Sequence, residues 1–294
     1  MITSNFFVSF ILSYKSTLCT LQRTVRKIRP VSWLRQPGTF LSICHTQIRA
    51  EFYDIAMKLF HVHKHLLEAD SFHVGILLSI AGGITDVITY RNRGHVFATA
   101  QAGNLVFLGI SLTDSEFSLA TTMRYLIPVL FFIAGLGITY LFHRRHYKHV
   151  HWRQIPLAIE MGLLMVTTFI DGNHNYLAAI LTNMAAGIQL AAFKRVNGIK
   201  MPTTMVAGDL RNGTEELITY AENKDREEWE NGWLYLVVAF TFLCGAIIGN
   251  WLDQWWGVQA MWLAVLILGV VWVRLFRDRF SDPNLRPRRS HHKH

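Results

Sequence analysis

Apolar residues fall into a series of stretches, each about as long as a helix that crosses a membrane. From residue 73 onward, short polar breaks separate eight of them: 73–90, 97–113, 124–142, 155–171, 176–193, 203–221, 233–252 and 258–276. A span of about 20 residues covers the roughly 30 Å of hydrocarbon in a bilayer. The pattern therefore predicts an all-α fold, a polytopic transmembrane helix bundle of about seven spans within a range of six to eight.

The sixth stretch is the least apolar of the eight. It contains Asp209, Arg211, Glu215 and Glu216, and one charge at the bilayer centre costs about 2.5 to 3.5 kcal/mol on insertion scales. We therefore expect this stretch either to be shielded by other helices or to be re-entrant. The second alternative favours seven spans over eight.

The chain also reads as two repeated halves, about 73–171 and 176–276. The matched segments are Ala81–Ile84 with Ala185–Ile188, Thr99–Leu105 with Thr204–Leu210, and Phe132–Gly135 with Phe242–Gly245. Their order is the same in both halves, and they share glycines and a Gly-Asn or Gly-Asp step that apolar composition alone does not supply. The match indicates an internal duplication.

At these positions the sequence resembles the YoaK family, which comprises membrane proteins of bacteria and fungi with no assigned activity. The residues that carry the resemblance are Gly82, Gly83 and Asp86, the stretch Phe97–Asn104, and its echo Ala207-Gly208-Asp209. The family usually has Thr or Ser before the Gly-Asn step, whereas both halves here have Ala, at 102 and 207. The resemblance implies a membrane fold and location but no substrate.

Composition supports a lipid environment. Hydrophobic residues make up 51% of the chain and charged residues only 17%, against about 25% charged in an ordinary soluble domain. The net charge of +9 comes from the two ends of the chain and leaves the middle nearly neutral. A nucleic-acid partner would need a folded basic face, so we expect the bilayer as partner and no nucleic acid.

The segment 1–56 differs from the rest of the chain because it is basic and mostly polar. It fits either an organellar presequence or an over-extended gene model, and the hydrophilic leader that starts at Met57 favours the second reading. We expect this extension to be disordered or absent from the native protein. The transmembrane domain is then 57–276, followed by a basic tail, 277–294.

Basic loops predict the orientation of the bundle. The loops 91–94, 144–153 and 194–200 are basic, and all three lie on one side if the second and fourth stretches cross fully. Because such loops mark the cytoplasmic side, we expect a multi-pass protein of a bacterial cytoplasmic membrane, with these loops and the tail in the cytoplasm.

Five polar residues are candidates for a solute pathway: Asp86, Asn104, Glu160, Asp209 and Arg211. A carboxylate at membrane depth is costly and is therefore a functional hypothesis by default, although Asp86 could also sit at the interface. Asn104 and Asp209 hold equivalent places in the halves, and we expect them to face each other across the interior. They either line a solute site or simply hydrogen-bond between helices. Glu160 is either a proton site or a partner of Arg211.

Six glycines are predicted to break helices or to let them approach closely: Gly82, Gly83, Gly103, Gly135, Gly208 and Gly245. Histidines cluster at 61–65, 143–151 and 291–294, but neighbouring cations and the lack of completing ligands argue against a metal. No nucleophile elbow, phosphate loop or zinc-protease motif occurs, so we expect neither an enzyme nor a cofactor. Two functions remain: a transporter of a small solute or ion, or a structural or accessory membrane protein. The sequence does not specify an oligomeric state.

Overall fold

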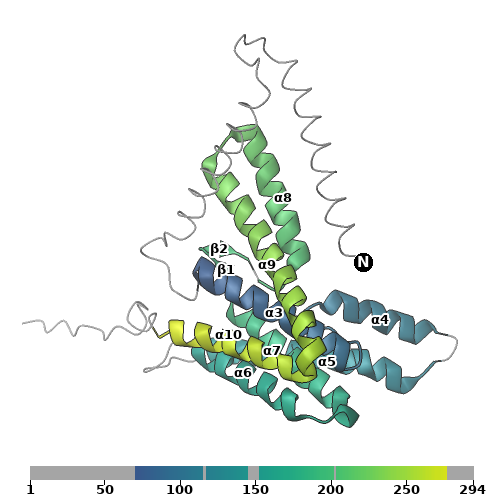
Figure 1. Ribbon diagram of the computed structural model, residues 1–294. Coiled ribbons are helices and arrows are strands. Elements are labelled where there is room, and N and C mark those ends of the chain that lie inside the picture. The colour runs from purple at the N-terminus through teal and green to yellow at the C-terminus, as the bar shows by residue number, and fades with distance from the viewer. Residues whose placement is uncertain (1–69, 115–116, 145–151, 202, 277–294) are drawn as a thin grey trace, which may run out of the picture. The chain divides into compact units, whose positions relative to one another are not determined.

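The computed structural model describes residues 70–114, 117–144, 152–201 and 203–276, and they are mostly helical (Figure 1). The α-helices are α3 (Phe72–Asn92), α4 (Gln101–Thr113), α5 (Leu119–His143), α6 (Gln154–Phe169), α7 (Asn175–Ala192), α8 (Val206–Asn223), α9 (Arg226–Trp256) and α10 (Met261–Arg274). The short elements are η2 (Gly172–His174), η3 (Gly257–Ala260), β1 (Arg195–Val196) and β2 (Ile199–Lys200). The all-α class is confirmed, and every predicted apolar stretch overlaps one of these helices. The extension 1–56, the Met57 start and the tail 277–294 lie outside the described residues.

Three helical segments in the described part of the chain are long and apolar enough to cross a membrane. They are α3, α5 and the run Arg226–Arg274, in which α9 and α10 follow each other. The apolar helix α6 is shorter. With 13 residues, α4 rises only about 20 Å, less than the hydrocarbon thickness. The expected total of about seven spans stays a prediction.

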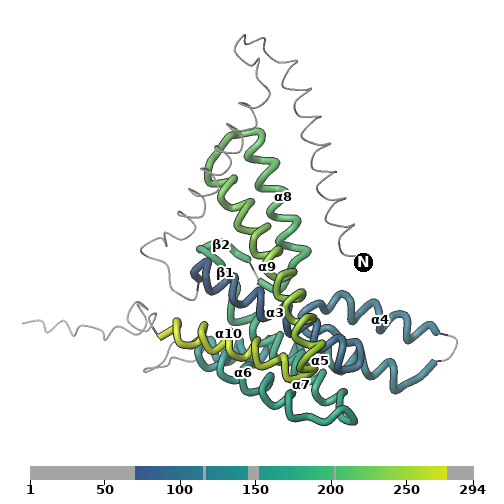
Figure 2. The backbone as a smooth tube through the Cα atoms, in the orientation of Figure 1, coloured from purple at the N-terminus to yellow at the C-terminus, as the bar shows by residue number. Residues whose placement is uncertain are grey.

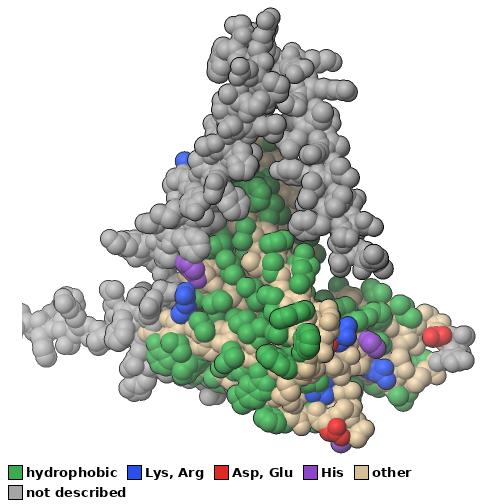
Figure 3. Space-filling view, in the orientation of Figure 1, with side chains coloured by type: hydrophobic (Ala, Val, Ile, Leu, Met, Phe, Trp, Pro, Cys, Tyr) green, Lys and Arg blue, Asp and Glu red, His purple; other side chains and the backbone are tan. Residues whose placement is uncertain are grey.

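Apolar side chains cover much of the face shown in Figure 3. Large residues such as Leu141 of α5 and Phe240 and Ile247 of α9 are more than half exposed. A soluble monomer rarely exposes apolar surface on this scale. Lipid is the environment in which these side chains are stable, as the apolar stretches of the sequence predicted.

The interior is built around α3 and α7. The most extensive helix contacts are those of α3 with α9 and of α5 with α7, whose paths Figure 2 traces. The main apolar core joins α3, α6, α7 and α10. The two remaining helices are peripheral, because α4 packs on α5 and α8 packs on α9.

In the α3–α9 and α5–α7 contacts, the backbones of the two helices come closest at glycines. A Cβ at Gly83 of α3 would overlap the backbone oxygen of Phe242 in α9, and one at Gly187 of α7 would overlap that of Phe132 in α5. Gly135 and Gly245 meet the backbone of the facing helix in the same way. Backbones this close leave no room for a side chain, which is how small residues hold membrane helices together.

Polar contacts define two ends of the bundle. At the end called here the Asp70 side, Asp70 before α3 pairs with Arg153 before α6 at 2.8 Å. At the other end, the Arg93 side, Arg93 donates to Asn175 of α7 at 2.6 Å and to the backbone oxygen of Thr167 in α6. The loop 91–94 therefore lies at the opposite end of α3 from Arg153. We expected all three basic loops on one side if the second and fourth stretches cross fully. Instead the loop 91–94 lies at the other end, and α5 also begins on the Arg93 side, where the Tyr176 hydroxyl of α7 donates to the Met123 carbonyl.

Candidate functional site

The connection from α3 to α4 folds back along α3 and is held there by Asp86. The chain turns at Gly94 and His95, which both have positive φ. The Thr99 backbone N–H and hydroxyl then donate to the two carboxylate oxygens of Asp86, at 2.6 and 2.7 Å. Asp86 lies six residues before the end of α3 at Asn92, about 9 Å along the helix axis. The segment before α4 thus re-enters the bundle.

Asn104 and Gln101 extend this polar cluster from the first turn of α4. Asn104 is 0% exposed; its amide oxygen accepts from the Phe97 N–H at 2.8 Å, and its amide nitrogen donates to the Phe97 carbonyl at 2.7 Å. Gln101 accepts from Asn104 and donates to Asn183 of α7 at 2.9 Å. Every side chain of the cluster therefore has a partner, and the re-entrant segment is fixed between α3 and α7.

Asp209 occupies the corresponding place in the second half but has different surroundings. Its side chain is 1% exposed, and neither carboxylate oxygen has a hydrogen-bond partner. One turn further along α8, Gly213 lies against Gly232 and Tyr235 of α9, and the Tyr235 hydroxyl donates to the Lys200 carbonyl at 3.3 Å. The face of α8 that carries Asp209 and Gly213 therefore lies against α9. α4 packs on α5 and α8 packs on α9, and the expectation that Asn104 and Asp209 face each other across the interior stays a prediction.

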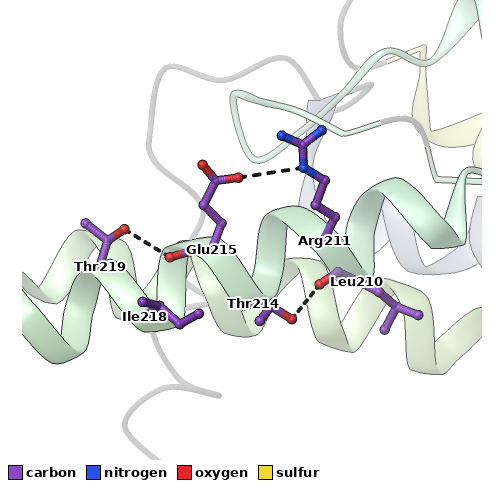
Figure 4. A pocket seen from close by; sticks show the side chains of 6 residues that line it. All are labelled: Leu210, Arg211, Thr214, Glu215, Ile218 and Thr219. Atoms are coloured by element: carbon purple, nitrogen blue, oxygen red, sulfur yellow. Dashed lines mark hydrogen bonds and ion pairs between the residues drawn. The ribbon is translucent and has the colours of Figure 1, made fainter.

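Glu160 and Arg211 lie in different environments. Glu160 of α6 is 1% exposed, and its Oε2 has no partner. The Arg211 side chain is 80% exposed and lies 3.9 Å from Glu215 on the outer face of α8, where the two side chains line an open hollow (Figure 4). Arg211 thus pairs with its neighbour one turn away, and the alternative that it partners Glu160 gains no support.

The glycines near the re-entrant segments differ in their surroundings. A Cβ at Gly82 would lie 2.9 Å from the Thr204 methyl group, and one at Gly103 would lie 2.9 Å from the Phe97 ring. At Gly208 it would meet nothing within 4 Å. Close packing therefore explains Gly82 and Gly103, whereas Gly208 is open.

Several residues that complete the site were not found from the sequence. Asn183 and Gln101 lie within apolar stretches where a single amide is easily taken for helix glue, and Thr99 has no signal of its own. Arg93 looked like an ordinary loop cation, yet it is 3% exposed and ties α3 to α6 and α7. The one feature of the sequence that could have pointed to these residues was the repeat of the polar segment Thr99–Asn104 as Thr204–Asp209.

No group of three or more histidine, cysteine or acidic side chains in the described part of the chain is arranged to hold a metal ion. The histidines 61–65, 146–151 and 291–294 lie outside that part. His143 packs against the Trp152 ring at 4.4 Å. The described site consists of buried carboxyl and amide groups, of which Asp86, Asn104 and Gln101 are joined by hydrogen bonds.

Apolar helices, glycine-mediated contacts and re-entrant polar segments together define an integral membrane protein. Residues 74–273 match the sequence profile of a family described as "Protein of unknown function (DUF1275)". The chain belongs to this family.

A curated relative gives the same assignment. The chain is 28% identical over 148 residues to the "UPF0700 transmembrane protein YoaK" of Bacillus subtilis (strain 168). The alignment covers 48% of this chain and 64% of the relative, so the chain spans a little under two thirds of that protein. No solved structure matches. The resemblance to the YoaK family is confirmed, and the family carries no assigned activity.

Proposed function

We propose that this membrane protein transports a small solute or ion through a bundle built from two halves of opposite orientation. The single observation that carries the proposal is the polar, re-entrant segment 93–100, which holds buried side chains between α3 and α7. In transporters made of inverted repeats, interrupted segments in matching places line the solute site near the midplane.

The two-half arrangement is supported by equivalent contacts. Gly83 approaches Phe242, and Gly187 approaches Phe132. In the repeat, Gly83 corresponds to Gly187 and Phe132 corresponds to Phe242, so the two contacts are equivalent. The α3–α10 contact has its counterpart in the α7–α6 contact. Each half then consists of a first helix, a peripheral helix, a long helix and a final helix, in that order.

Opposite orientation is supported by the contacts at helix ends. α3 begins on the Asp70 side, where Asp70 pairs with Arg153. α7 begins on the Arg93 side, where Asn175 binds Arg93, and ends beside Arg153, which stacks on Phe193. Helices in equivalent places thus run in opposite directions.

Six crossings follow from this arrangement, namely α3, α5, α6, α7, α9 and α10. Although α6 and α10 have only 16 and 14 residues, each runs between the two ends. α6 runs from Arg153 to Thr167 beside Arg93, and α10 follows Gln259, bonded to Thr168, and ends near Trp272, bonded to Gln154.

α4 and α8 then start within the membrane and return to the side from which their connections entered. Arg144, Lys194, Arg195 and Arg274 lie near helix ends on the Asp70 side, whereas Arg91 on the other side is paired with Asp253. The positive-inside rule then makes the Asp70 side cytoplasmic in a cell membrane.

Labelling with a membrane-impermeant thiol reagent tests this topology. In a variant without the native cysteines, His95→Cys and Asp114→Cys should react from outside the cell. Arg195→Cys and Lys224→Cys should react only in inverted vesicles. Reaction of His95→Cys and Asp114→Cys from opposite sides would mean that α4 crosses, and the six-crossing arrangement would fail.

Flux measurements test transport itself. Purified protein in liposomes should move one of a panel of small solutes or ions, and Asp86→Asn and Asp209→Ala should reduce that flux. Arg211→Gln is the matched control, because Arg211 lies on the outer face of α8. Flux that is the same for wild type and Asp209→Ala would remove Asp209 from the pathway. If no panel member moves, the alternative of a structural or accessory protein is favoured.

A further inference from the structure

The two buried carboxylates near the re-entrant segments differ in how their charge is compensated. Asp86 accepts two hydrogen bonds from Thr99, and these stabilise an ionised carboxylate. Asp209 is as deeply buried, yet its two oxygens accept no hydrogen bond. Among the described residues, no cation forms an ion pair with Asp209. The nearest arginine in sequence, Arg211, is exposed and lies beside Glu215 instead.

The sequence supplies a reason for this difference. In the first half the acceptor oxygen of Asn104 is satisfied by the backbone N–H of Phe97, seven residues earlier. Seven residues before Asp209 stands Pro202, and proline has no backbone N–H. The backbone donor that serves Asn104 in the first half therefore has no counterpart at Pro202.

A buried carboxylate that accepts no hydrogen bond is far more costly than a neutral carboxylic acid, so such a group favours taking up a proton over staying charged. Two ionisable groups of α8 and α9 near this position supply no compensating positive charge. The Tyr235 hydroxyl of α9 donates to the Lys200 carbonyl, and Glu216, two turns along α8, is itself an acid.

We propose that Asp209 is the proton-binding carboxyl of the transporter, so that solute movement is coupled to movement of a proton. This inference rests on the transport function proposed above. In each cycle a carboxylate oxygen of Asp209 accepts a proton from water that reaches it from one side of the membrane. It returns that proton to water on the other side, and no other atom is exchanged.

Infrared difference spectroscopy tests the site without requiring transport. Purified wild-type protein titrated with acid and base should show a protonated-carboxyl stretching band that titrates and that is absent from Asp209→Asn. Glu160→Gln is the matched control, because it changes another buried acid in the same way and should keep the band. Asp209→Thr is a second variant in case the amide disturbs folding, and size-exclusion chromatography checks that each variant is folded.

Proton uptake by liposomes that contain a pH-sensitive dye is measured on the same preparations. Loss of the band and of proton uptake in both Asp209 variants supports the inference. A band that depends on Asp209 without flux of any tested solute leaves the proton site intact and counts against transport. A carboxylate that is ionised over the whole pH range, or whose signal responds to sodium at constant pH, overturns the inference even where solute flux is found.

Discussion

The segments that precede α4 and α8 hold equivalent places in the sequence, but side-chain hydrogen bonds hold the first segment, whereas the acid at the matching place after the second has no hydrogen-bond partner. Before α4, Asp86, Asn104 and Gln101 satisfy one another and the backbone of the loop. Before α8, the matching side chain is an acid without a partner. The comparison shows that hydrogen bonds fix the polar side chains of the first half, whereas the equivalent acid of the second half has none. Under the proton coupling proposed above, that acid is the group whose charge changes.

The largest expected effect is a loss of stability when the glycine contacts, which occur in both halves, are filled by a larger side chain. Gly83→Ala and Gly187→Ala each place a Cβ against backbone of the facing helix, and overpacking of this kind costs about 1–3 kcal/mol or more. We expect both variants to lower thermal stability in detergent by similar amounts. Gly208→Ala is the control, since it meets nothing within 4 Å and alanine stabilises a helix relative to glycine by about 0.5–1 kcal/mol. If Gly187→Ala were harmless while Gly83→Ala was not, the two contacts would not be equivalent.

The next prediction separates the two buried acids. Asp86→Ala leaves the Thr99 donors buried without an acceptor, which costs about 1–3 kcal/mol for each unsatisfied group. Asp209→Asn removes an uncompensated acid and should leave stability unchanged or slightly higher. The unfolding temperatures of both variants, measured at the same pH and compared with wild type, test this difference. Equal losses would mean that Asp209 has a structural partner and would break the comparison.

Exchanging side-chain types between the halves gives a third test. Asn104→Asp directs an acceptor toward the Phe97 carbonyl and Gln101 oxygen, which now accept from the Asn104 amide. We expect a loss of about 1–3 kcal/mol at neutral pH that becomes smaller in acid, where the new carboxyl can donate. A loss of the same size at every pH would indicate a steric rather than an electrostatic cause.

The smallest expected effect is the pH response of Glu216, outside the spanning helices. Burial, followed by the charges of Glu228, Glu215 and Glu227, raises the pKa of the Glu216 carboxyl above its ordinary value of 4.5. A carboxyl whose pKa is raised on folding costs stability as pH rises through that pKa, because the folded state binds its proton more tightly. Glu216→Gln should therefore slightly flatten the loss of stability above pH 4.5, as read from unfolding temperatures at several pH values. An unchanged pH profile would show that the four acids are well screened by water.

The sequence predicts the helices well and the contacts poorly, for physical reasons. Apolar runs identified all the described α-helices, because burial in lipid demands long apolar segments. Glycines at 83, 135 and 245 were recognised as close-packing residues. The folding back of 93–100 was not foreseen, because it depends on the pairing of Thr99 with Asp86. The same gap produced the incorrect placement of the loop 91–94, whose side follows from where the chain turns.

The antiparallel course of α3 and α7 has a consequence for how such a chain could arise. A half with three crossings leaves the membrane on the side opposite to its entry, so a tandem copy is inserted upside down. If the two halves descend from one ancestral gene, its product had to be stable in both orientations before fusion. The charge bias on which the proposed orientation rests, with Arg144 and Lys194 at one end and Arg91 paired with Asp253 at the other, would then have been acquired later. On this view, the ancestral half inserted into the membrane in both orientations, whereas the fused chain inserts in one orientation that its own sequence determines.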